Sequence, residues 1–282
     1  PCYEYRWRHP GESREAFGLR VANELETKIL ELGPEIVAGF VAETVVGATA
    51  GAVAPVPGYF RRIREICDRY GVHLILDEVM CGTGRTGTFF AYEQEDVVPD
   101  IVTIAKGLAA GYQPIGAVLA NDRLCSSIRD GSGFFQHGHT FMGHTTAAAA
   151  ALATLGVIHD ENLLENVSAR GESLRTKLAN ALGDNPAVGD VRGRGLFIGV
   201  EFVKDRETKE PFDPSMKLHQ RVKESAMQRG LLCYAMGGTI DGHRGNHVLI
   251  APPYTISERD EDQIVSRFSS AVADAVPAMV TR

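Results

Sequence analysis

The sequence predicts an α/β fold built on a mostly parallel sheet. Four short segments are apolar along almost their whole length, which is typical of strands that are buried on both faces of such a sheet. Segments with helical spacing of apolar residues separate several of them, as expected for strand–helix–strand units. The predicted strands are residues 36–41, 72–76, 101–105 and 115–119.

The helices and loops of this part follow from spacing and from glycine and proline. A predicted helix at 16–32 stops at Gly33-Pro34, and a second at 59–70 stops at Gly71. Residues 47–58 and 81–87 are rich in glycine, which predicts loops.

The pattern changes near residue 160. Long helices are predicted at 145–159 and 161–182. Beyond them, the pattern predicts a smaller α+β unit with strands at 196–202 and 247–250 and helices at 215–229 and 257–275. We therefore expect residues 1–160 to form part of a large domain, and residues 161–282 to form a connecting helix and a small C-terminal domain.

Composition excludes several classes of protein. With 44% hydrophobic and 23% charged residues, the chain is typical of a globular protein. The net charge is −7 and the basic residues are scattered, so nucleic acid is not an expected partner. The longest apolar run, residues 147–158, is too short to span a membrane. Five dispersed cysteines without a C-x-x-C pair predict reduced thiols, and the absence of a signal peptide adds to the expectation of a cytoplasmic protein.

An amine and a carboxylate follow two of the predicted strands. Lys106 follows the apolar run 101–105, and Asp77 follows the run 72–76. Ligands of open α/β sheets bind beyond the carboxyl ends of the strands. An amine there can form a Schiff base with the aldehyde of pyridoxal phosphate, and a carboxylate can pair with the pyridinium nitrogen. The two residues therefore predict a site for this cofactor.

Other interpretations of these residues have less support. A lysine at a strand end is usually a solvated surface charge, but Ala105 and Gly107 leave room for a bulky group beside Lys106. Acidic pairs such as Asp77-Glu78 bind magnesium in ATPases, yet no G-x-x-x-x-G-K-S/T loop precedes this one. The loop 82–87 lacks the Lys-Ser/Thr ending, and no G-x-G-x-x-G joins a strand to a helix, so nucleotide sites are not predicted.

Three stretches carry a resemblance to a known family. They read LILDEVMCGTGRTG at 74–87, PDIVTIAKGL at 99–108 and GYQPIG at 111–116. Together they resemble the core signature of class III aminotransferases, which are pyridoxal phosphate enzymes of the aspartate-aminotransferase fold (fold type I). Further matches extend along the chain, at residues 42–47, 139–144, 191–195 and 251–253.

The resemblance implies roles for individual residues. Lys106 would be the Schiff-base lysine, Asp77 the partner of the pyridinium nitrogen, and Val79 a residue that packs on one face of the ring. Thr140 would reach the cofactor phosphate from the neighbouring subunit of a homodimer whose active sites are shared. Glu43 would lie near the substrate carboxylate. The implied reaction moves an amino group from an amine or amino acid to a keto acid by a ping-pong Schiff-base mechanism.

Two departures from the family pattern refine this expectation. Leu249 stands where many members that use 2-oxoglutarate have an arginine. The nearest upstream arginine is Arg244, so the chain resembles members that use pyruvate with ω-amines or β-amino acids, in which a mobile arginine binds carboxylates. The alternative interpretation of Arg244 is a solvated arginine of the loop.

The second departure concerns the start of the chain. The family's phosphate cup and ring-stacking aromatic precede the region that begins here, so we expect an N-terminally truncated chain that binds the cofactor weakly.

Two alternative functions stay open. A decarboxylase or aminomutase of the same fold would use the same Lys106 and Asp77, because the cofactor carries the chemistry that these enzymes share. A degenerate, non-catalytic relative is the other alternative. The sequence does not name the amino donor, a choice that depends on the glycine-rich loop 237–245.

Overall fold

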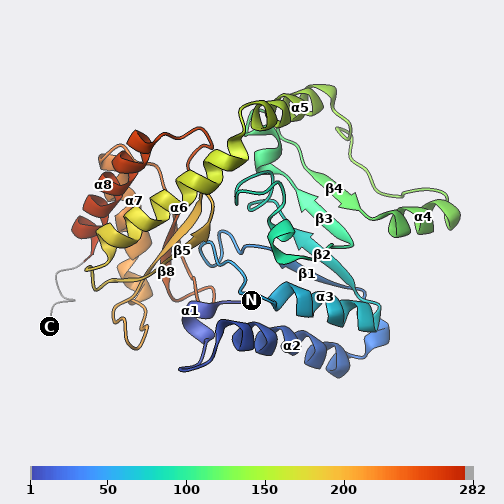
Figure 1. The fold of residues 1–282 in the computed structure, drawn as a ribbon, viewed down its shortest axis with the longest axis horizontal. Coiled ribbons are helices and arrows are strands. Elements are labelled where there is room, and N and C mark those ends of the chain that lie inside the picture. The colour runs from blue at the N-terminus through green and yellow to red at the C-terminus, as the bar shows by residue number, and fades with distance from the viewer. Residues whose placement is uncertain (1, 277–282) are drawn as a thin grey trace.

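The computed structural model describes residues 2–276, which contain two four-stranded sheets with helices packed around them (Figure 1). In the first sheet the strands follow chain order, and β1, β2 and β3 are parallel while β4 is antiparallel to β3. The predicted α/β architecture with a mostly parallel sheet is confirmed. The strands are β1 (Gly39–Glu43), β2 (His73–Asp77), β3 (Ile101–Ile104) and β4 (Ala117–Ala120).

Two helices, α2 (Arg14–Leu32) and α3 (Tyr59–Tyr70), pack against one another beside this sheet. Helix α3 begins after Gly58 and ends at Gly71, both of which have a positive φ that glycine adopts without strain. Its buried face joins one apolar cluster with Leu74 and Leu76 of β2. Because side chains alternate along a strand, this burial turns Asp77 toward the opposite face.

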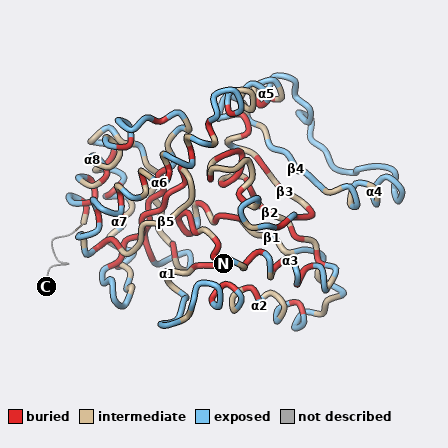
Figure 2. The backbone as a smooth tube through the Cα atoms, in the orientation of Figure 1, coloured by how far each residue is buried: buried red, intermediate tan, exposed pale blue. Residues whose placement is uncertain are grey.

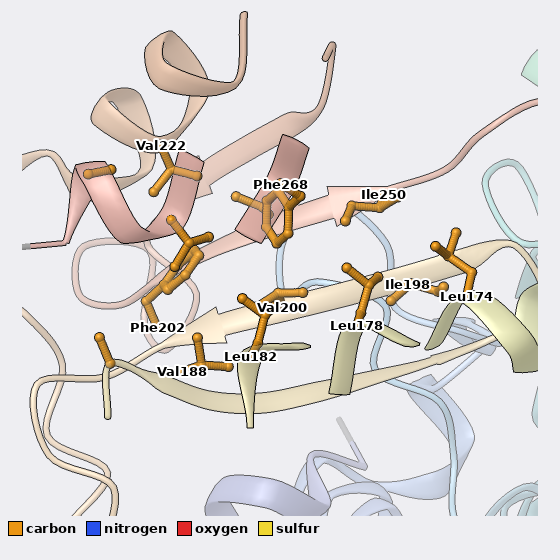
Figure 3. Packing of buried hydrophobic residues seen from close by; sticks show 14 of the residues in the cluster. Leu174, Leu178, Leu182, Val188, Ile198, Val200, Phe202, Val222, Ile250 and Phe268 are labelled. Atoms are coloured by element: carbon orange, nitrogen blue, oxygen red, sulfur yellow. The ribbon is translucent and has the colours of Figure 1, made fainter. Parts of the chain in front are cut away.

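The second sheet is antiparallel, in the order β5-β6-β8-β7. Three helices supply the apolar side chains that fill its core, namely α6 (Leu163–Leu182), α7 (Leu218–Gln228) and α8 (Glu258–Ala275). Among these side chains are Leu178, Val222 and Phe268 (Figure 3). Phe197 and Leu249 point the other way and join a cluster with residues of the first half of the chain. The sheet is therefore buried on both faces, and its strands are β5 (Val188–Arg194), β6 (Phe197–Phe202), β7 (Tyr234–Gly237) and β8 (Asn246–Ile250).

The remaining elements connect these layers. The other α-helices are α1 (Glu4–Trp7), α4 (Asp122–Asp130), α5 (Thr145–Asp160), α6 (Leu163–Leu182), α7 (Leu218–Gln228) and α8 (Glu258–Ala275). Short 3₁₀ helices are η1 (Pro34–Ile36), η2 (Ala91–Glu95), η3 (Lys106–Ala109) and η4 (Pro214–Met216). None of the helices within residues 2–276 combines the length and the apolar character needed to cross a bilayer.

One prediction about burial is wrong. The strand predicted at 115–119 exists as β4, but it runs antiparallel and all four of its residues are exposed (Figure 2). Gly39 and Val41 of β1 are also exposed. Both strands lie at the edges of the sheet, and no helix of the described residues covers these surfaces. The first strand also starts later than predicted, because residues 34–36 form η1.

The segment before α2 packs on the second sheet through buried charges. The carboxylate of Glu201 on β6 is fully buried and accepts hydrogen bonds from Tyr3, from Arg6 Nε (2.6 Å) and from Arg192 Nη1 (2.7 Å). The guanidinium of Arg192 also lies 4.9 Å from the centre of the Tyr3 ring. Residues 2–7 thus contact the C-terminal half of the chain, and the division near residue 160 stays a prediction.

Replacing Glu201 by leucine should destabilise the fold strongly. The change leaves the buried guanidinium of Arg6 without its carboxylate, and breaking a buried ion pair in this way costs about 3–5 kcal/mol. Glu210→Leu is the matched control, because its ion pair with Lys204 is exposed and such pairs contribute about 0–1 kcal/mol. Denaturant unfolding measures both, and equal midpoints for the two variants would contradict the importance of the buried network.

Candidate active site

The register of the first sheet brings three charged residues together at the carboxyl ends of its parallel strands, which we call the site edge of the sheet. Glu43 is paired with Asp77, and Asp77 is paired with Thr103 on the next strand. Lys106 follows three residues after Thr103, at the start of η3. The amine and the carboxylates that the sequence placed at strand ends are therefore neighbours in space.

Lys106 has an unusual backbone. Its φ is +41°, in the left-handed region that residues with a side chain rarely adopt, and its side chain is exposed. The turn is held in place because Leu108 and Ala109 of η3 are buried in a cluster with Ala151 of α5. Strained backbone of this kind is concentrated at functional sites, where the surrounding structure maintains it. The conformation therefore supports a functional role for Lys106.

Asp77 and Glu78 have different environments although they are adjacent. One oxygen of Asp77, Oδ1, accepts a hydrogen bond from the backbone N–H of Val79 at 2.9 Å, and the side chain is only partly buried. Glu78 is 1% exposed and points into the core. Asp77 is thus directed to the edge of the sheet, while Glu78 belongs to the interior.

The carboxylate of Glu78 organises the loops behind the site, a role the sequence did not reveal. It accepts hydrogen bonds from Thr44 Oγ1 (2.6 Å) and from the backbone N–H groups of Ala91 (2.8 Å) and Tyr92 (3.0 Å). Burial raises the pKa of Glu78 even though these hydrogen bonds oppose the shift. The single available signal was its position after Asp77, where alternation along the strand turns it inward.

Glu43 is electrostatically linked to the other two residues. Its Oε2 accepts a hydrogen bond from the backbone N–H of Gly47 at 2.7 Å. Burial raises the pKa of Glu43, and the negative charge of Asp77 raises it further, whereas the Gly47 hydrogen bond and the positive charge of Lys106 lower it. The site edge of the sheet therefore carries two carboxylates and one amine, with Asp77 on the central strand of the three.

The glycine-rich loop 81–87 joins the two sheets. The partly buried guanidinium of Arg85 donates to the carbonyl oxygens of Leu196 (3.1 Å) and Pro252 (2.6 Å) and lies 4.5 Å from the centre of the Tyr254 ring. The Tyr254 hydroxyl in turn donates to the carbonyl of Thr83 at 2.9 Å. These contacts give the loop a structural role in holding the second sheet against the site.

Thr140 and Arg244 lie apart from this edge. Thr140 is exposed in the segment between α4 and α5, which projects from the body of the molecule (Figures 1 and 2). Arg244 is exposed in the loop between β7 and β8, and its Nε donates to Asp241 Oδ2 at 2.7 Å. Within residues 2–276, no hydrogen bond joins either side chain to Lys106, Asp77 or Glu43. Their roles stay predictions, as does ring packing by Val79.

An α/β fold that presents an amine and a carboxylate at adjacent strand ends has the groups that covalent binding of a carbonyl compound requires. Its sequence matches the class-III aminotransferase family over residues 5–272. The chain belongs to this family, and the resemblance of the three core stretches is confirmed.

Relatives of the chain are aminotransferases. It is 48% identical over 274 residues to an aminotransferase of Gibberella zeae, covering 97% of this chain and 54% of that protein. It is 45% identical over 279 residues to an uncharacterized aminotransferase of Schizosaccharomyces pombe, covering 99% and 61% respectively. A gamma aminobutyrate transaminase of Solanum lycopersicum is 36% identical, with 96% of this chain and 51% of that protein aligned.

Solved structures agree with this assignment. The chain superimposes on an (S)-enantioselective omega-transaminase from Thermomicrobium roseum with a TM-score of 0.90 and 38% identity, covering 98% of this chain and 60% of that one. An omega-transaminase from Pseudomonas jessenii in complex with PMP gives 0.88 and 36%, covering 98% and 59%. The aspartate-aminotransferase-like fold is thus confirmed, and the chain spans between about half and three fifths of the length of these relatives.

Proposed function

We propose that the complete protein is a pyridoxal-phosphate-dependent transaminase that moves an amino group from an amine or amino acid to a keto acid. The observation that carries this proposal is the shared edge of Glu43, Asp77 and Lys106 at the carboxyl ends of β1, β2 and β3. Membership of the class-III family supports it, because the matched residues 5–272 include all three of these residues.

The residues present fit the cofactor. Lys106 is exposed and forms no ion pair with the described residues, so its amine is accessible to an aldehyde. The Oδ1 of Asp77 is held by Val79, and within the described chain no hydrogen bond engages Oδ2, which leaves it for a protonated ring nitrogen. When bound, pyridoxal phosphate supplies an aldehyde for amines and a cationic ring that delocalises negative charge.

Each residue then has a defined task. The Nζ of Lys106 takes a proton from the amine-bearing carbon of the substrate and later returns a proton, as base and then as acid. With the cofactor bound, the Asp77 carboxylate would pair with the positive charge of the ring nitrogen, and the Val79 side chain would pack against the ring. Thr140 of a second copy would donate its hydroxyl to the phosphate.

Substrate binding is assigned to Glu43 and Arg244. A guanidinium binds a carboxylate through two parallel hydrogen bonds, which suits Arg244 as the anchor of a keto acid such as pyruvate. Its present partner, Asp241, is exposed and lies three positions away, so the pair can exchange for a substrate carboxylate at small cost. When no carboxylate is bound, Glu43 would be the alternative partner of the arginine.

A second copy of the chain is the proposed partner. Large apolar side chains are exposed on β4 and on the segment between α4 and α5: Val118, Leu119, Phe134, Phe135, Phe141 and Met142. Large apolar side chains that are exposed together in one part of the chain mark interaction sites, and Thr140 lies in the same segment. Analytical ultracentrifugation of the complete polypeptide should give a dimer, and a monomer at micromolar concentration would contradict this assignment.

A half-reaction assay tests the proposed function. The complete polypeptide, loaded with pyridoxal phosphate, is mixed with ω-amines, β-alanine or taurine without keto acid, and its visible absorbance should change once. Pyruvate or 2-oxoglutarate should then restore the spectrum, as expected for ping-pong transfer. Release of carbon dioxide or a rearranged amine without keto acid would identify a decarboxylase or an aminomutase. Failure to acquire any cofactor absorbance would favour a non-catalytic relative.

A further inference from the structure

A buried histidine links the loop that contacts Glu43 to the loop that carries Arg244. His247 of β8 is 0% exposed, and both of its ring nitrogens are engaged. Nδ1 lies 2.7 Å from the hydroxyl of Thr239, and Nε2 lies 3.0 Å from the carbonyl oxygen of Ala48. His247 and Ala48 are 199 positions apart in the chain, so the imidazole bridges separate parts of the molecule.

The partners assign the protonation of the ring. A carbonyl oxygen can only accept, so Nε2 carries a proton and donates it to Ala48. Burial lowers the pKa of His247 to about 4, and the positive charge of Arg192 on β5 contributes to this shift. Glu201 of β6 opposes the shift, and His219 of α7 adds to it. The ring is therefore neutral at pH 7, and Nδ1 accepts the hydrogen bond of the Thr239 hydroxyl.

The first bridged loop positions Glu43. Ala48 follows Gly47, whose N–H donates to the Glu43 carboxylate at 2.7 Å. The loop passes directly over the imidazole, because a Cβ added to Gly51 would lie 2.7 Å from His247 Cδ2. Arg192 holds the carbonyl oxygens of Ala50 (2.5 Å) and Gly51 (2.8 Å) beside it.

The second bridged loop carries Arg244. The loop is closed by backbone hydrogen bonds from Gly238 N to Gly245 O (2.9 Å) and from Ile240 N to Arg244 O (3.0 Å). Thr239 is 5% exposed and lies between the donors of these two bonds, so its bond to His247 fixes the base of the loop. Arg244 itself is exposed and lies across the loop from Ile240, next to the closing residue Gly245.

We propose that His247 is a positioning residue that sets the separation of Glu43 and Arg244 and thereby selects for substrates that bear a carboxylate. This inference rests on the proposed transaminase function and on the assignment of Arg244 as the carboxylate anchor. His247 does not touch the reacting atoms, and it acts by holding the two loops in register.

The kinetic test compares two substrates. In His247→Phe the ring fills the space but forms neither hydrogen bond, and Thr239→Val removes the hydroxyl alone. Each net hydrogen bond contributes about 1 kcal/mol, so the KM for pyruvate should rise about fivefold to tenfold or more. The rate of the half-reaction with butylamine, which lacks a carboxylate, should change by less than about twofold. Thr239→Ser keeps the hydroxyl and should restore the KM.

Two controls separate positioning from general destabilisation. Val248→Ala alters the adjacent residue of β8, which faces the apolar core between the second sheet and helices α6 to α8. This substitution should lower the unfolding temperature without changing the KM for pyruvate. In an Arg244→Ala background, His247→Phe should have little further effect on the KM for pyruvate, because both substitutions act on the contact between Arg244 and the substrate carboxylate. Additive effects of the two substitutions would overturn the proposal.

Amide hydrogen exchange gives a readout that does not depend on activity. In the complete polypeptide, residues 44–53 and 238–245 should exchange about fivefold to tenfold faster in His247→Phe and Thr239→Val than in the unaltered protein. Unchanged exchange in both loops would refute the link even if the protein had no transaminase activity. Absence of the half-reaction in the unaltered protein would instead refute the proposed function alone.

Discussion

Replacing Lys106 by alanine should abolish amino-group transfer while leaving the chain folded. The substitution removes both the amine that holds the aldehyde and the base that moves the proton, so the rate should fall by at least about 10⁴-fold. Because the side chain is exposed and outside the buried clusters, the unfolding temperature should change little. The half-reaction with butylamine measures the loss, and turnover above one thousandth of the original rate would contradict the assignment.

Glycine at the same position separates function from stability. Left-handed backbone costs a residue with a side chain about 1–2 kcal/mol, and glycine avoids that cost while losing about 0.5–1 kcal/mol to chain entropy. Lys106→Gly should therefore be inactive but more stable by up to about 1 kcal/mol. Ala110→Gly is the matched control, since Ala110 is exposed in the same turn with a φ of +50°. It should gain similar stability in denaturant unfolding and keep its activity.

Replacing Asp77 by asparagine should slow the reaction by about 10²–10³-fold. Asparagine has the shape of aspartate, and its oxygen can still accept the hydrogen bond from Val79 N. It lacks the negative charge that would hold a cationic ring, and the loss of one preorganised electrostatic partner typically costs this much. The rate constant of the half-reaction at saturating cofactor measures the effect, and a change below about tenfold would exclude the assigned role.

The neighbouring carboxylate provides the contrast. Glu78→Gln places an amide among the donors Thr44, Ala91 and Tyr92, so it should lower the unfolding temperature. The rate constant of the folded protein at saturating cofactor should stay within about threefold of the original. Of these two adjacent acids, Asp77 would then act in the reaction and Glu78 would stabilise the fold. The opposite outcome, with Glu78→Gln the slower enzyme, would reverse the two assignments.

Elements with a strong local pattern were predictable. The apolar runs of β2 and β3 and the glycine-terminated helix α3 have the predicted type, with ends that shift by one residue at most. Charged residues directly after such strands must lie at one edge when the strands are parallel, so Lys106 and Asp77 could be placed together. Family membership then confirmed the resemblance of the core stretches, whereas the roles of Lys106 and Asp77 stay predictions.

Elements without such a pattern were missed for physical reasons. Strand β5 contains glycine and charged residues, and its extended form depends on pairing with β6 rather than on its own composition. Helix α4 has polar residues around an exposed surface, and its best local signal was the Asn121 cap, whose side chain accepts from Leu124 N at 3.0 Å. Burial of β4 was predicted wrongly because its composition does not reveal what covers it.

Local sequence was sufficient to place an amine and a carboxylate at the ends of buried strands, because apolar periodicity and strand direction are set by neighbouring residues. Contacts between distant segments decided the rest. They place Glu78 in the interior, hold Lys106 in a left-handed turn, and bring His247 between Ala48 and Thr239. Such contacts depend on how layers pack and on which polar groups lose water, and no short stretch of sequence contains that information.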